Sequence, residues 1–143
     1  TSIWYGCRLD AADGAILIGA RSNVQDNSVL TAGAGAIRIG VDTTIGHNVE
    51  LAECTIGDRC LIGIGSRVAP GTVVEDDVFL AAGAITTPGQ ILHGGRLWGG
   101  QPARELAALD ERKKVLVRET IVTYCDYAAE LQRAQALAAG RTA

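Results

Sequence analysis

The chain has 143 residues, a formal net charge of −3 and a hydrophobic content of 48%, but only 4% aromatic residues. This length suits one domain, and the interspersed charges with no basic stripe argue against a nucleic-acid-binding protein. The four cysteines match neither a zinc motif nor a dense disulfide framework, so we expect them to be reduced. They are Cys7, Cys54, Cys60 and Cys125.

An aliphatic residue recurs at every sixth position through most of the first 92 residues. From Ile39 to Ile85 the repeat reads IGVDTT, IGHNVE, LAECT, IGDRCL, IGIGSR, VAPGTV, VEDDVF and LAAGAI. The fifth position is usually small or β-branched, and inserts at 11–17 and 31–38 interrupt the period. This pattern predicts an all-β solenoid, a triangular parallel β-helix that turns a corner every six residues. An amphipathic helix is excluded here because glycine is frequent and the period is not 3.6.

The composition changes after the repeat decays near Pro88. We expect the β-helix to cover residues 1–92, a linker to cover 93–101 and a helical segment to cover 102–139. Pro102 suits the first turn of a helix, and Gly and Pro are nearly absent beyond it. One apolar stripe, formed by Val117, Ile121, Tyr124, Ala128 and Leu131, predicts a long α-helix that packs along the β-helix or against a partner.

The first residues fall in the middle of a repeat. Ile3 opens a hexad, so Thr1 and Ser2 would close an earlier one. We therefore expect further N-terminal coils, and with them any targeting signal, to lie outside this sequence. The charge-free window 78–95 contains proline, histidine and four glycines and keeps the repeat, so we expect no transmembrane segment.

Four segments, IWYGCRL, IGARSNVQDNSVL, IGHNVELAECTIG and WGGQPARELAAL, together resemble the gamma-class carbonic anhydrase family. The likeness runs from Ile3 to about Leu131. It implies a left-handed parallel β-helix of hexapeptide repeats with a long C-terminal α-helix, assembled as a trimer. It also implies zinc sites between subunits, each with three histidine ligands, two from one subunit and one from its neighbour.

The resemblance places only one of these ligands in this chain. His47 matches the ligand given across the interface, whereas Thr31 and Ala52 stand where the family has the other two histidines. The vestigial site positions are Thr31, Ala52, Gln25, Asp26 and Asn23, and Tyr124 also matches the family. The family's Arg-Gly-Asp is replaced by Asp10-Ala11-Ala12, which removes the arginine that is thought to help bind the anionic reactant.

Catalytic zinc requires three protein ligands and an open position. We therefore expect no catalytic residue and no cofactor bound by this chain alone, with zinc possible only at an interface with a partner that supplies two histidines. His47 would complete that site; the alternative is an unmetallated, hydrogen-bonded histidine. For Gln25 and Asp26 the choice lies between orienting a metal-bound water and hydrogen bonding to the backbone and Arg21, and we favour the second. His93 is expected to be a solvated loop residue.

The resemblance implies a structural, inactive subunit of a heterotrimer with homologous carbonic-anhydrase-like subunits. Such trimers attach to the membrane arm of mitochondrial respiratory complex I (NADH:ubiquinone oxidoreductase), on the matrix side of the inner membrane. Two alternatives stay open. One is a hexapeptide-repeat acyltransferase that uses coenzyme A, with His47 as general base. The other is a homotrimer of the bacterial cytoplasm with an unknown ligand.

Overall fold

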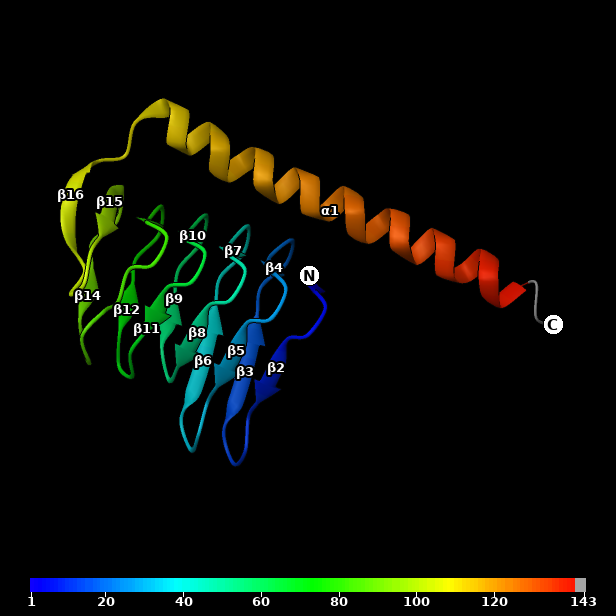
Figure 1. Cartoon of the computed structure of the whole chain (residues 1–143), viewed down its shortest axis with the longest axis horizontal. Coiled ribbons are helices and arrows are strands. Elements are labelled where there is room, and N and C mark those ends of the chain that lie inside the picture. Colours follow the sequence, from blue (N-terminus) through cyan, green and yellow to red (C-terminus); the bar gives the residue numbers. More distant parts are fainter. Residues whose placement is uncertain (141–143) are drawn as a thin grey trace.

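The computed structural model describes residues 1–140 as a parallel β-helix followed by one long helix, α1 (Glu111–Gly140) (Figure 1). The strands form three sheets, and apart from β16, which pairs antiparallel with β15, neighbouring strands in each sheet come from successive coils. The seven-stranded sheet contains β1 (Ser2–Ile3), β4 (Asn23–Val24), β7 (Thr44–Ile45), β10 (Leu61–Ile62), β13 (Phe79–Leu80), β15 (Arg96–Gly99) and β16 (Arg104–Ala108). The four-stranded sheet contains β2 (Arg8–Asp10), β5 (Val29–Thr31), β8 (Glu50–Ala52) and β11 (Arg67–Val68). The five-stranded sheet contains β3 (Ala15–Ile18), β6 (Ala36–Ile39), β9 (Thr55–Ile56), β12 (Val73–Val74) and β14 (Ile91–Leu92). The predicted solenoid of parallel coils with a C-terminal helix is confirmed.

The aliphatic residue of each hexad fills the inside of the coil. These side chains stack in one column per sheet, and from the second coil onward none is more than 4% exposed. The columns are Val24, Ile45, Ile62 and Leu80; Leu30, Leu51 and Val68; and Ile39, Ile56, Val74 and Leu92. Burying each of these side chains is worth roughly 1.5–3 kcal/mol, so the repeat supplies most of the apolar core.

The small residue at the fifth position has a hydrogen-bonding role as well as a steric one. The buried hydroxyl of Ser22 donates to the carbonyl oxygen of Gly40 at 2.7 Å, and that of Ser28 donates to Gly46 at 2.8 Å. Each hydroxyl also accepts a backbone N–H from the next coil, Ser28 from Val49 at 3.1 Å. A small polar side chain therefore satisfies backbone groups that the tight corner would otherwise leave without a partner.

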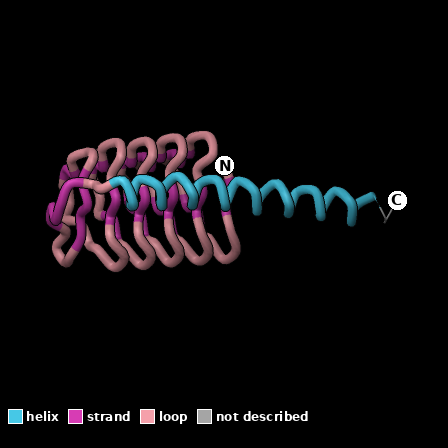
Figure 2. Tube along the Cα trace, turned by 90° about the horizontal axis from the view of Figure 1, so that it is seen from above, coloured by secondary structure: helices cyan, strands magenta, loops and turns pink. Residues whose placement is uncertain are grey.

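α1 lies along the seven-stranded sheet, roughly parallel to the axis of the β-helix (Figures 1 and 2). Val117 and Ile121 of the predicted stripe are buried, and Tyr124 and Ala128 are half-buried. Every described helix residue after Ala128 is exposed, and Figure 2 shows the last turns extending past the first coil. Among residues 1–140, no helix is long and apolar enough to cross a membrane.

The predicted helix start near Pro102 is wrong. Residues 104–108 form β16, which pairs antiparallel with β15, so the expected linker 93–101 itself contains a strand. The helix begins nine residues later, where the backbone N–H of Lys113 donates to Asp110 Oδ1 at 2.9 Å, an N-cap contact. Sheet pairing at the end of the solenoid overrides the helix propensity of the Arg-Glu-Leu-Ala-Ala sequence, because propensity is worth only tenths of a kcal/mol per residue.

Candidate functional site

His47 lies at the corner between β7 and β8, and Asp26 occupies the equivalent position one coil earlier. The two residues are neighbours because the coils stack in register, with the backbone N–H of Asn48 donating to the carbonyl oxygen of Asp26 at 3.0 Å. His47 Nδ1 is 3.1 Å from Asp26 Oδ2. Asp26 Oδ1 also accepts a hydrogen bond from the backbone N–H of Tyr5 at 3.2 Å, so a residue of the first coil also holds the carboxylate in place.

The other ring nitrogen of His47 faces the C-terminal helix. His47 Nε2 is 3.4 Å from the hydroxyl oxygen of Tyr124. Burial, together with the negative charge of Asp26, raises the pKa of Tyr124, so its phenol stays protonated and donates to Nε2 at neutral pH. Because the carboxylate of Asp26 can only accept a hydrogen bond from Nδ1–H, we assign the neutral imidazole the tautomer that carries its proton on Nδ1.

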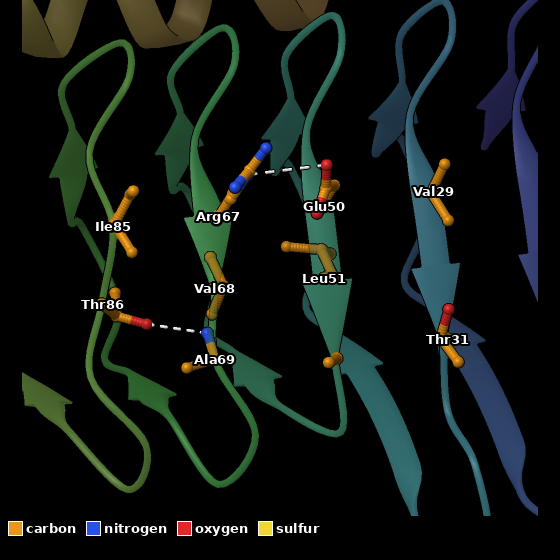
Figure 3. A pocket seen from close by; sticks show the side chains of 10 residues that line it. Val29, Thr31, Glu50, Leu51, Arg67, Val68, Ala69, Ile85 and Thr86 are labelled. Atoms are coloured by element: carbon orange, nitrogen blue, oxygen red, sulfur yellow. Dashed lines mark hydrogen bonds and ion pairs between the residues drawn. The ribbon is translucent and has the colours of Figure 1, made fainter.

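Thr31 and Ala52 lie side by side on the four-stranded sheet, as register partners in β5 and β8. They line a groove of about 250 Å³ that also includes Ala69 and Thr86 (Figure 3). The rim carries an ion pair, with Arg67 Nε 3.5 Å from Glu50 Oε1. The structure thus brings together the two positions that lack histidine, and His47 is not part of the lining.

The groove does not fit a zinc ion held by this chain alone. A threonine hydroxyl and an alanine methyl group stand at the two positions where the resemblance implies imidazoles, and no group of three or more His, Cys, Asp or Glu residues within residues 1–140 could hold a metal. His47 by itself does suit a single donated ligand, because a carboxylate anchors Nδ1 and leaves Nε2 as the donor atom.

Asn23, in β4, and Gln25, directly after β4 and near α1, are both buried and form a short hydrogen-bonded chain. Gln25 Nε2 donates to Asn23 Oδ1 at 3.2 Å, and Asn23 Nδ2 donates to Thr44 Oγ1 at 3.1 Å. Arg21, expected as a partner of Gln25 and Asp26, instead pairs with Asp42 at 2.6 Å. The two amides therefore pair with neighbouring side chains of the same sheet.

The remaining candidates lie elsewhere. The side chain of His93 is 66% exposed, and its Nδ1 is 3.3 Å from Glu75 Oε1. Burial raises the pKa of the Cys54 and Cys60 thiols to about 12, so neither is a thiolate at neutral pH. The sequence analysis did not predict the Asp26–His47 contact; the signal for it is their separation of 21 residues, which is one coil of three hexads plus the three residues by which segment 31–38 lengthens the repeat.

Comparison with known proteins agrees with this fold and these motifs. Residues 53–88 match the family model described as bacterial transferase hexapeptide (six repeats). The chain is 34% identical over 135 residues to "Gamma carbonic anhydrase 1, mitochondrial" of Arabidopsis thaliana, covering 90% of this chain and 49% of the relative. It is 31% identical over 137 residues to "Carbonic anhydrase" of Geobacillus kaustophilus, covering 93% and 75% respectively.

Among solved structures, a hexapeptide transferase family protein from Anaplasma phagocytophilum superposes with a TM-score of 0.85 at 35% identity. That superposition covers 90% of this chain and 76% of the Anaplasma chain. The chain spans about half the length of the Arabidopsis relative, and three quarters of the Geobacillus one. With a conserved fold and this level of identity over nearly its whole length, the chain belongs to the gamma carbonic anhydrase-like family.

Proposed function

We propose that this chain is a structural gamma-carbonic-anhydrase-like subunit that is inactive by itself and lends His47 to the zinc site of a neighbour. The observation that carries this proposal is the groove on the four-stranded sheet, where Thr31 and Ala52 stand together without a ligand atom that zinc prefers. A homotrimer would hold one imidazole per interface, which is too few for a catalytic site.

The contribution of this chain is to present an oriented ligand. Asp26 fixes the ring of His47 through Nδ1, so the direction of Nε2 is set before a partner arrives. Bound zinc would supply a water of lowered pKa at the completed site. The histidine-free groove of this chain would then face its other neighbour as a packing surface only.

We place the subunit in a heterotrimer on the matrix side of the mitochondrial inner membrane, attached to the membrane arm of respiratory complex I. The support is the family itself together with the mitochondrial designation of the Arabidopsis relatives. The bacterial carbonic anhydrase relative supports the other location, a homotrimer in a bacterial cytoplasm with an unknown ligand.

The Asp26–His47 pair also favours a second candidate, an acyltransferase. A histidine whose Nδ1 is anchored by a carboxylate is the arrangement of a general base, which would activate a hydroxyl or amine for attack on an acyl-coenzyme A thioester. Coenzyme A binding separates the two candidates. Calorimetry with coenzyme A should give no binding heat for the structural subunit and saturable binding for the transferase.

Native mass spectrometry of the assembly from its own source tests the main proposal, because it reads subunit composition and bound metal together. We expect a heterotrimer whose zinc is lost when His47 is replaced in a His47→Ala variant. A homotrimer with one zinc at every interface would refute the proposal, since this chain would then hold a complete site.

A further inference from the structure

The nitrogen that His47 would offer to a neighbour is already engaged within its own chain. Its Nε2 accepts a hydrogen bond from the Tyr124 hydroxyl at 3.4 Å, while Asp26 holds Nδ1 at 3.1 Å. Nε2 carries a single lone pair in this tautomer. This nitrogen therefore cannot accept a hydrogen bond from the phenol and bind a metal ion at the same time.

Tyr124 is held in this place by two aromatic neighbours, although its side chain is only half-buried. Its ring lies edge-on to Trp4, with centroids 5.3 Å apart, and to Tyr127, with centroids 5.7 Å apart. Trp4 belongs to the first coil and is fixed there by a hydrogen bond from its Nε1 to Ser2 Oγ at 3.0 Å. One helical turn before Tyr124, Ile121 is buried, so the helix cannot shift without exposing apolar surface.

We propose that Tyr124 is a positioning residue that occupies His47 Nε2 in the unassembled subunit and must release it when a partner's metal takes this ligand. The inference rests on the proposed function, because it concerns the same donated nitrogen. Because Tyr124 belongs to α1, the position of this helix decides whether His47 Nε2 is free to bind a metal. A subunit without its assembly partner keeps Nε2 bonded to the phenol, which lowers the affinity of that nitrogen for free metal.

The test uses the full chain with both missing ligands supplied, as Thr31→His/Ala52→His, so that a homotrimer offers three histidines per interface. Cobalt(II) is the probe, because its visible absorption reports ligation by nitrogen without an activity assay. Adding Tyr124→Phe should raise cobalt affinity roughly threefold to tenfold, the scale of one net hydrogen bond. Tyr127→Phe is the matched control: Tyr127 packs in the same aromatic cluster, and its hydroxyl makes no contact with His47 among the described residues.

A second readout needs no metal. In the natural sequence, the ¹⁵N resonance of His47 Nε2 should move toward that of a free lone pair in Tyr124→Phe and stay unchanged in Tyr127→Phe. If the three-histidine chain binds cobalt equally well with and without Tyr124→Phe, the proposed role of Tyr124 is overturned, whereas the proposed function is not. Failure of the trimeric three-histidine chain, isolated by size-exclusion chromatography, to bind cobalt at all would overturn the proposed function, and the role of Tyr124 with it.

Discussion

At the scale of single residues, the coil stacking decides which side chains meet. Asp26 and His47 are 21 residues apart, yet their side chains are 3.1 Å apart because equivalent positions of adjacent coils lie above one another. The same stacking puts Arg21 against Asp42 at a different corner, where both residues have positive φ, 58° and 52°. Contacts of this kind are determined by the register between coils and cannot be predicted from neighbouring residues in the sequence.

The Arg21–Asp42 pair predicts a pH-dependent stability. The hydrogen bond from Arg21 lowers the pKa of Asp42. A carboxyl group whose pKa is lower in the folded state stabilises the fold fully above its unfolded pKa, about 3.9, and loses this contribution as the pH falls through the folded value. We therefore expect Asp42→Asn to lower the melting temperature at pH 7, and this difference to fade in acid below the folded pKa.

Thermal unfolding at neutral and acidic pH checks this expectation. Asparagine tolerates positive φ, so the variant removes the charge without adding backbone strain. Asp126→Asn is the control, because the Asp126 carboxylate is exposed and forms no ion pair with any residue from 1 to 140. A loss of stability in Asp42→Asn that is the same at both pH values would contradict the ion-pair explanation.

At the scale of elements, α1 consists of two parts with different surroundings. Its first half packs on the seven-stranded sheet through Val117 and Ile121, which are 4% and 6% exposed. Its second half extends past the first coil, where Leu137 is 67% exposed (Figure 2). The apolar stripe predicted from the sequence is therefore a docking face only where coils lie beneath it.

Truncation of one aliphatic side chain in each half measures this difference. We expect Ile121→Ala to lower the free energy of unfolding by about 2–5 kcal/mol, because it removes a buried side chain and leaves a cavity. Leu137→Ala should change it by less than about 0.5 kcal/mol. Urea denaturation followed by circular dichroism gives both values, and similar losses in the two variants would mean that the projecting half is packed in solution.

At the scale of the whole molecule, the candidate positions of the proposed zinc site lie on two different faces. The groove with Thr31 and Ala52 lies on the four-stranded sheet, and His47 lies at a corner beside α1. If the proposed site is assembled from the groove of one subunit and the corner of the next, this chain lacks the ligands of the groove but keeps the ligand of the corner, His47. Such a chain would be a competent neighbour for a subunit that keeps the other two histidines.

Co-expression with such a subunit tests the borrowed ligand directly. The partner would be a three-histidine family member in which the histidine that matches His47 has been replaced, so that its own trimers hold two ligands per interface. We expect mixed trimers to bind zinc at the interface to which this chain lends His47, as read by metal analysis of the purified complex. His47→Ala in this chain should abolish zinc binding at that interface while the trimer stays assembled. Zinc that still binds to this variant would exclude donation by His47.

The hexapeptide period was sufficient to predict the solenoid and its apolar columns, because each coil contacts only its neighbours and its rules are local. It did not place the end of the solenoid, because β15, inside the predicted linker, pairs parallel with β13. The missing ligands at Thr31 and Ala52 follow from the resemblance to the gamma-class carbonic anhydrases and stay a prediction. Local sequence could not place the start of α1, because residues 104–108 have helical propensity but gain backbone hydrogen bonds by pairing with β15.

The tertiary structure alone decided the surroundings of His47. Its partners Asp26 and Tyr124 lie 21 and 77 residues away, and no local pattern predicts that a corner of the third coil contacts a tyrosine about four turns into the helix. The register of the coils fixes the first contact, and the docking of α1 fixes the second. The sequence therefore identifies His47 as the candidate ligand, whereas the orientation of its ring depends on how the helix and the coils pack together.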